Sequence, residues 1–181
     1  VPGRGMNTPD PLVLLCQSAA GYNNLMKLVS KAFLDSDPLS GPQVPLAALE
    51  GHTDGLIALT GGPQGSVGRL LSEGQKDAAV EVLQRLKTLF PGRLYIELQR
   101  HGGSFAAIED GVEPALVDLA YAHDLPLVAT NDCYFATPDM YEAHDALLCI
   151  AEGAYISQDE RRRLTPEHYF KSADEMTALF A

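Results

Sequence analysis

The sequence predicts an α/β fold with about four parallel strands and flanking helices, followed by a helical C-terminal segment. Four short apolar runs alternate with segments of helical periodicity, which is typical of parallel strands joined by crossover helices. After the fourth run the strand patterns stop and helix-start signals recur. The four apolar runs are Leu12–Cys16, Leu56–Leu59, Leu94–Leu98 and Leu125–Ala129. A continuous apolar run with helices around it predicts a strand that is buried on both faces.

The segments between these runs carry apolar residues three and four positions apart, as on one face of a helix. A stretch rich in Pro, Ser and Gly, residues 35–45, is expected to be a loop. We expect helices over Ala19–Leu34, Ser66–Leu71, Lys76–Leu89 and Glu113–His123, and a short helical turn at Leu46–Leu49.

Helix-start signals dominate the C-terminal part. Thr137-Pro138 and Thr165-Pro166 each combine an N-cap residue with a proline at the first helical position. The first pair predicts a helix over Asp139–Ala151, and the second repeats the signal. Ser172 and Glu175 have the spacing of a capping box for a last helix.

Composition restricts the function classes. The 181 residues suffice for one domain with a real core, and the net charge of −11 argues against a surface for duplex DNA. The one basic cluster, Arg161–Arg163, follows Asp159 and Glu160 and is more typical of a solvated helix face or an ion-pair patch. Three cysteines without CxxC spacing indicate reduced thiols. No apolar run or signal peptide indicates a membrane, so the cytoplasm is the expected location.

The two ends of the sequence predict a piece of a longer polypeptide. The chain begins at Val1 in a loop-like stretch and stops within an apolar helical run that has no cap. A sheet of four strands would be thin and would carry an exposed edge that can pair with another copy.

Polar residues follow the strand runs, and the first place to look for a site is Thr130–Asp132. In α/β folds, ligands collect outside the carboxyl ends of the strands. A carboxylate and an amide at that point are candidate functional groups. The alternative is that Asn131-Asp132 only makes a turn, because both residue types favour turns.

Glu97 and His101 follow another strand, and together they offer oxygen and imidazole donors for a divalent ion. The alternative is that Glu97 pairs with Arg100 or with a neighbouring helix. The turn from Gly61 to Gly68 has amides that could cradle phosphate, but a tight packing turn is the stronger interpretation because no P-loop ending follows.

Two further residues have plain explanations. Cys133 could be a thiolate ligand, but a buried free cysteine is the commoner case. His144 shares a helical stripe with Tyr141 and Leu148, and we expect a partly buried surface histidine. Spacing alone supports no Ser-His-Asp or Cys-His arrangement.

Taken together, several blocks resemble the polymerase and histidinol phosphatase (PHP) domain of bacterial DNA polymerase III alpha subunits. The most specific blocks are ATND, EAHDALLCI and LTPEHYFKS, and the match runs in collinear order over nearly the whole chain. The resemblance implies a distorted β/α barrel that is incomplete here. Its first strands and their HxH metal ligands would lie upstream, and the polymerase aspartates would lie downstream. It also implies a division into residues 1–136, the later part of the PHP domain, and 137–181, a helical segment leading towards the polymerase module.

The resemblance also bears on metal binding. Relatives that bind zinc, manganese or magnesium carry D-x-H after the ATN block, and here Asp132 is followed by Tyr134 in the histidine position. A second family histidine corresponds to Pro11, which has no donor atom. The phenol of Tyr134, with an ordinary pKa of about 10, is a poor metal ligand at neutral pH. Asp132 is therefore a remnant ligand position, and Glu97 and His101 are further candidate metal ligands. No catalytic or cofactor-binding residue is assigned, and no cofactor is expected in this stretch.

Two functional hypotheses follow from the resemblance. The first is a non-catalytic scaffold of a replicative DNA-directed DNA polymerase (a nucleotidyltransferase). Its partners would be the rest of the alpha chain and the proofreading exonuclease subunit. DNA would be bound by the full-length polymerase rather than by this stretch. The second is a metal-dependent phosphoesterase or 3′–5′ proofreading exonuclease, in which upstream histidines complete a site with Asp132, Glu97 and His101. The residues Pro11 and Tyr134 favour the first. A free-standing small-molecule enzyme is disfavoured because no constellation is complete.

Overall fold

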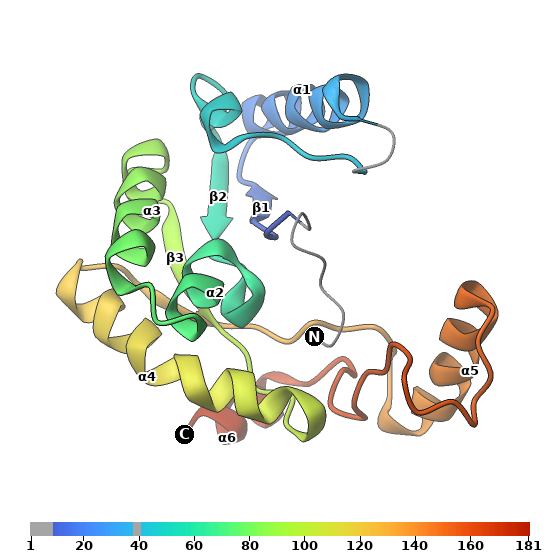
Figure 1. The fold of residues 1–181 in the computed structure, drawn as a ribbon. Helices are drawn as coiled ribbons and strands as arrows, with labels where there is room; N and C mark the ends of the chain where they lie inside the picture. The colour runs from blue at the N-terminus through green and yellow to red at the C-terminus, as the bar shows by residue number, and fades with distance from the viewer. Residues whose placement is uncertain (1–8, 38–40) are drawn as a thin grey trace. The chain divides into compact units, whose positions relative to one another are not determined.

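The computed structural model describes residues 9–37 and 41–181, which form two compact units. The first unit comprises the chain up to Leu98 together with Val112–Val128, and the second comprises Gln99–Gly111 and Ala129–Ala181. Figure 1 shows the elements in chain order. The strands are β1 (Val13–Cys16), β2 (Leu56–Leu59), β3 (Leu94–Leu98) and β4 (Leu127–Ala129). The helices are α1 (Ala19–Asp35), α2 (Ser66–Ser72), α3 (Lys76–Leu89), α4 (Ala106–Ala122), α5 (Tyr141–Glu152) and α6 (Ala173–Phe180). Four short 3-10 helices are η1 (Leu46–Leu49), η2 (Gly62–Gln64), η3 (Gly103–Phe105) and η4 (Pro138–Met140).

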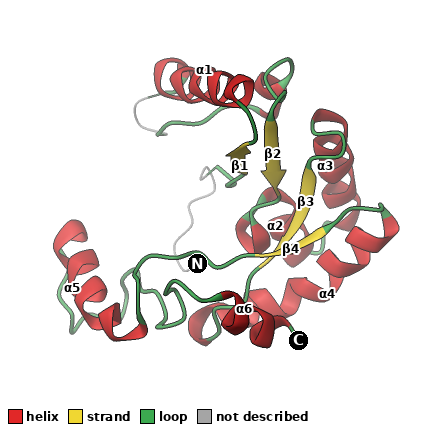
Figure 2. Cartoon of the chain, turned by 180° about the vertical axis from the view of Figure 1, so that it is seen from behind, coloured by secondary structure: helices red, strands yellow, loops and turns green. Residues whose placement is uncertain are grey.

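The first unit holds a mostly parallel four-stranded sheet in the order β1-β2-β3-β4, which confirms the predicted α/β class (Figure 2). Strands β2 and β3 run parallel, with Ala58 opposite Leu94. Their side chains form the centre of the core together with apolar residues of α2 and α3. The core members that are almost fully buried include Leu56, Val67, Leu83, Phe90 and Ile96.

The prediction that all four strands are parallel is wrong for β1, which pairs antiparallel with β2. Cys16 at the end of β1 lies opposite Leu56 at the start of β2. The reason is the long segment after α1, which brings the chain back to the end of β1. There the Gln17 amide donates to the Gly55 carbonyl at 2.8 Å.

The prediction that the apolar runs are buried on both faces is wrong at the two sheet edges. Leu15 in β1 and Leu127 in β4 are exposed, whereas β2 and β3 are almost completely buried. Both exposed strands are edge strands of the sheet, so each has a neighbour on one side only within the described residues. Strand β4 also begins two residues later than expected, because Pro126 has no amide to donate to a ladder.

Two helix starts differ from the expectation. Helix α4 begins at Ala106, seven residues before the expected Glu113, and Pro114 lies inside it rather than at its first turn. The turn η3 leads into α4 without a break, so the helix extends further towards the N-terminus than its apolar pattern indicates. Thr165-Pro166 opens only a single turn, in which the Thr165 hydroxyl accepts the Glu167 amide at 3.3 Å. The capping box of α6 is confirmed, since Ser172 and Glu175 bond each other's backbone amides.

Glycines at 21 and 55 allow the close approach that returns the chain to β1. A Cβ atom on Gly21 would lie 1.9 Å from the Gly55 carbonyl oxygen, and neither backbone can move away easily. Gly21→Ala is therefore expected to lower the free energy of unfolding by about 3 kcal/mol or more, as overpacking against backbone does. The measurement is urea unfolding followed by circular dichroism.

The matched control is Gly111→Ala in α4, where a Cβ meets nothing within 4 Å. This substitution should be neutral or stabilise by about 0.5–1 kcal/mol through helix propensity. Equal effects of the two substitutions would contradict the close-approach argument.

Candidate functional site

The second unit gathers most of the predicted site residues around His101, a buried histidine after β3. Glu109 in α4 accepts hydrogen bonds from the His101 amide at 2.7 Å and from the Gly102 amide at 3.1 Å. Its other oxygen lies 2.7 Å from His101 Nδ1. Both side chains are about 97% buried. A single carboxylate thus fixes the position of the loop and the orientation of the imidazole ring.

The other ring nitrogen of His101 is occupied as well. The Asp132 backbone amide donates to His101 Nε2 at 3.2 Å. Because Nε2 accepts this bond, the ring proton lies on Nδ1 and is donated to Glu109. A histidine that binds a metal commonly donates its other nitrogen to a carboxylate in this manner. Here the second nitrogen accepts a peptide amide of the chain itself.

His168 stacks on His101, with ring centroids 4.0 Å apart and an interplanar angle of 12°. Its Nδ1 accepts a hydrogen bond from the Thr165 amide at 3.2 Å. Burial, and secondly the nearby His101, lowers the pKa of His168 from 6.5 to about 4. His168 is therefore neutral at physiological pH.

Thr165 and Asn131 tie the surrounding loops together. The Thr165 hydroxyl donates to the His101 carbonyl at 3.0 Å and accepts the Glu167 amide at 3.3 Å. The Asn131 side-chain amide donates to the carbonyls of Glu167 and Tyr169. The Asn131-Asp132 pair is thus held by tertiary contacts from its side chain and its backbone, beyond a simple turn.

Asp132 and Tyr134 lie at the surface beside this buried network. The Tyr134 ring makes edge contacts with His168 and with His144 of α5, at centroid distances of 5.9 and 5.6 Å. Arg162 lies near the Tyr134 hydroxyl at 3.5 Å. Burial, and then the Asp132 carboxylate, raises the pKa of Tyr134 above its ordinary value. The phenol therefore stays protonated at neutral pH and offers no anionic oxygen to a metal ion.

Glu97 lies in the first unit, where its side chain bonds the turn after β2. Its carboxylate accepts the Gly61 amide at 2.9 Å, and its own amide donates to the Thr60 hydroxyl at 3.0 Å. A carboxylate at this glycine-rich turn is unfavourable for a phosphate. Gly65 and Gly68 approach backbone carbonyls so closely that a Cβ atom would clash, which supports the tight-turn interpretation.

Several smaller expectations can be settled. Cys133 is exposed rather than buried, and its thiol donates to the Asn131 carbonyl. His144 is half-buried, as expected. The basic cluster is an ion-pair and hydrogen-bond patch, because Arg161 makes a two-pronged bond to Asp145 at 2.5 and 2.6 Å. That bond lowers the pKa of Asp145.

The described residues do not fit a metal centre. Within residues 9–37 and 41–181, no three His, Cys, Asp or Glu side chains are placed to hold one ion. His101 has no free lone pair, Tyr134 is protonated, and Pro11 has no donor atom. Of the three candidate ligands, Glu97 accepts the Gly61 amide in the first unit, whereas His101 bonds Glu109 and the Asp132 amide in the second.

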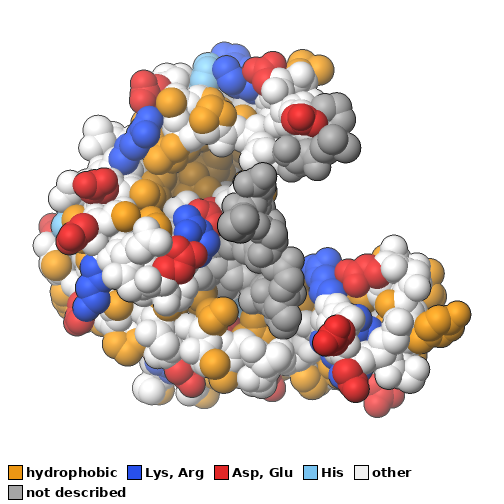
Figure 3. Space-filling model, viewed as in Figure 1, with side chains coloured by type: hydrophobic (Ala, Val, Ile, Leu, Met, Phe, Trp, Pro, Cys, Tyr) orange, Lys and Arg blue, Asp and Glu red, His pale blue; other side chains and the backbone are white. Residues whose placement is uncertain are grey.

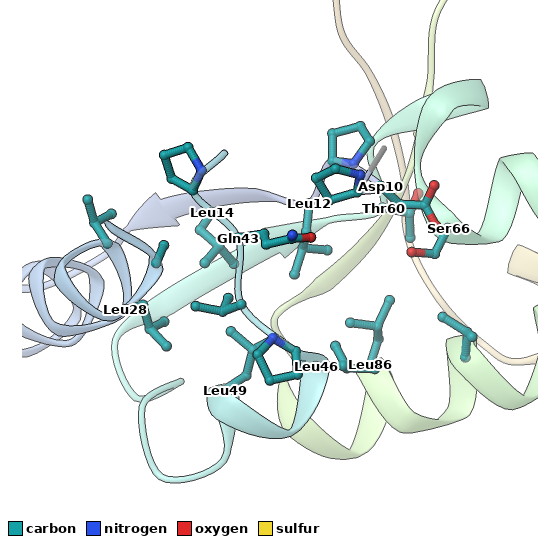
Figure 4. Close-up of a pocket in the computed structure, with 18 of the residues that line it drawn as sticks. Asp10, Leu12, Leu14, Leu28, Gln43, Leu46, Leu49, Thr60, Ser66 and Leu86 are labelled. Carbon is teal, nitrogen blue, oxygen red and sulfur yellow. The ribbon is translucent and has the colours of Figure 1, made fainter. Parts of the chain in front are cut away.

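The first unit contains a cavity of about 720 Å³ between β1, α1, η1, α2 and α3. Its walls are mainly leucine, valine and proline side chains, and Asp10, Thr60 and Ser66 lie at one end (Figure 4). Arg69 closes that end by a two-pronged bond to Asp10 at 2.8 and 3.0 Å. Sequence reasoning gave no sign of this cavity. No helix among the described residues is long and apolar enough to cross a membrane.

The comparison with known families identifies the class of protein to which this α/β fold belongs. The PHP domain profile matches residues 4–101, more than half of the 181 residues, and the chain belongs to this family.

Curated relatives are DNA polymerase III alpha subunits. The chain is 53% identical to the protein of Caulobacter vibrioides over 94% of its length. Identity is 38% to the Vibrio cholerae protein and 36% to the Escherichia coli K12 protein, each over 94% of the chain. The chain spans only about 14–15% of the length of these relatives.

The low pKa of His168 predicts a pH-dependent stability. The unfolded chain binds a proton near pH 6.5, whereas the folded chain does so only near pH 4. Stability is therefore full above pH 6.5 and is lost as the pH falls to 4, by at most about 3 kcal/mol. Urea unfolding of the wild type and of His168→Gln over this range checks the prediction.

The difference between the two proteins isolates the histidine, because carboxylates titrate alike in both. The wild type should lose more stability than the variant between pH 6.5 and 4. Parallel pH profiles would show that His168 is not the group responsible.

Proposed function

We propose that this chain is a non-catalytic, structural part of a DNA polymerase III alpha subunit. In that protein it would support the polymerase module and offer a docking surface to the proofreading exonuclease subunit. DNA-directed DNA polymerase activity would reside elsewhere in the same polypeptide, and DNA would be reached through those other parts. A cytoplasmic location belongs to the same proposal. The support is the PHP family membership and the similarity to alpha subunits.

The observation that carries the proposal is the occupied ring of His101. Metal-assisted hydrolysis needs a bound ion that lowers the pKa of a water molecule. A neutral imidazole can donate one lone pair to such an ion, and here that lone pair accepts the Asp132 amide. The remaining nitrogen donates to buried Glu109. A metal ion could bind His101 only if this hydrogen bond were broken.

The positions of Tyr134 and Pro11 support the same conclusion independently. Each replaces a histidine that metal-binding relatives are expected to carry, and neither residue can act as a ligand at neutral pH. Asp132 is left as a remnant ligand. Its carboxylate is exposed, whereas its backbone amide takes part in the buried network. The polar cluster is thus arranged to hold loops together, which is the chemistry of a scaffold.

The test is the metal content of the full-length protein that contains this chain, purified without chelators and compared with a Pro11→His/Tyr134→His variant. We expect no stoichiometric zinc, manganese or magnesium in the wild type and a gain of metal in the variant. Elemental analysis by mass spectrometry gives the answer directly.

The rival function is a metal-dependent phosphoesterase completed by other residues of the longer protein. Stoichiometric metal in the wild type would favour it. So would release of nucleotides that depends on manganese or magnesium and is lost in Asp132→Ala. Either result would contradict the scaffold proposal.

A further inference from the structure

Helix α5 in the second unit exposes an apolar face to solvent. Leu147 and Ile150 are 60% and 77% exposed, and Ala143 completes a row at spacings of four and three residues. Tyr155 and Ile156, just after the helix end, are 75% and 61% exposed. An amphipathic helix normally turns such residues inward. A row of this kind at the surface marks an interaction site.

The opposite face of α5 is already anchored within the second unit. Tyr141 donates its hydroxyl to the Leu164 carbonyl, Asp145 holds Arg161, and Cys149 is buried. These three residues follow one another at spacings of four. The helix therefore cannot simply rotate to bury Leu147 and Ile150, because it would lose these anchors.

The surface around the apolar row is acidic. The sequence contains no lysine or arginine between Arg100 and Arg161. The acidic side chains of this surface are exposed and form no ion pair within the described residues: Asp139, Glu142, Glu152, Asp159 and Glu160. Figure 3 shows hydrophobic and acidic side chains close together over this part of the chain.

The three neighbouring arginines offset the acidic charge only in part, because six carboxylates lie between residues 139 and 160. Arg161 is directed at Asp145, and Arg163 donates to the carbonyls of Ile156 and Gln158. Arg162 lies over the ring of Tyr134. An anionic partner such as DNA or an acidic membrane would be repelled by the exposed carboxylates. A second copy of the chain would bring the same acidic surface against itself.

We propose that the apolar face of α5 binds a basic amphipathic helix of another protein. Apolar side chains of the partner would pack on Leu147 and Ile150, and its flanking lysines or arginines would meet the acidic rim. The inference rests on the docking role proposed above, and it names the surface and the chemistry of the partner. It does not depend on whether the chain binds metal.

The experiment measures binding of a synthetic helical peptide to the 181-residue chain by fluorescence anisotropy. The peptide has about 20 residues, enough to form a helix, with leucines on one face and lysines beside them. A second peptide carries glutamate in place of each lysine. We expect the basic peptide to bind and the acidic peptide to bind at least about tenfold more weakly.

Variants then locate the site. Leu147→Ser/Ile150→Ser should weaken binding about tenfold or more, because two apolar contacts are lost. Glu142→Lys/Glu152→Lys should weaken it several-fold and reduce its dependence on salt. The control is Tyr22→Ser/Phe33→Ser in α1, which removes two comparably exposed apolar side chains and should leave binding unchanged. Circular dichroism confirms that each variant is folded.

Several outcomes would overturn the proposal. These are equal binding of the acidic peptide, equal loss in the α1 control, and self-association of the chain that Leu147→Ser abolishes. Binding to the 181-residue chain but not to the full-length protein would show that α5 is covered by the same polypeptide. None of these results bears on the metal content, so a failure here is distinguishable from a failure of the scaffold assignment.

Discussion

The Glu109 carboxylate, held by three hydrogen bonds from one short loop, is the interaction on which the second unit depends. Two of those bonds satisfy the amides of His101 and Gly102, and the third sets the His101 ring. Removing this carboxylate would leave buried donors without an acceptor, at about 1–3 kcal/mol each. Once the ring is set, its far nitrogen accepts the Asp132 amide and its face packs on His168. The imidazole thereby joins the segments 99–111 and 129–181, together with the bond from the Thr165 hydroxyl to the His101 carbonyl.

This arrangement has the form of a metal-ligand histidine without the metal. A carboxylate orients the ring, and the opposite lone pair is directed at a partner, but the partner is a peptide amide. In this structure the histidine fixes the position of the loops around it. Stacking on a neutral His168, with its pKa lowered to about 4, contributes to the same end.

Much of the fold could be predicted from the sequence, because periodicity reports directly on local structure. The sequence predicts strands β2 and β3 and helix α3 with their observed bounds, since each has a clean apolar pattern that ends at polar or turn-forming residues. The direction of β1 could not be predicted. It depends on the close contact between Gly21 and Gly55, which local sequence patterns do not predict. The exposure of β4 follows from its edge position, which is a property of the whole sheet.

Only part of the candidate site could be predicted from the sequence, because only part of it follows from local patterns. The polar residues at strand ends indicated Asp132, Glu97 and His101, but not that Glu97 bonds Gly61 in the first unit. Glu109 and His168 were missed because they lie 8 and 67 residues from His101 in the sequence. Only the family resemblance of the block LTPEHYFKS, which contains His168, drew attention to this residue. The contact between His101 and Glu109 could not be predicted, because the expected helix started after Glu109.

The most direct test of the account is the protonation state of the His101 ring, measured by long-range ¹H–¹⁵N NMR with and without added Zn²⁺. The account predicts a neutral ring protonated at Nδ1, with a hydrogen-bonded Nε2 whose resonance does not move when zinc is added. A zinc-induced shift of Nε2, absent in Asp132→Ala, would show that the nitrogen is free to bind a metal, and would contradict the account.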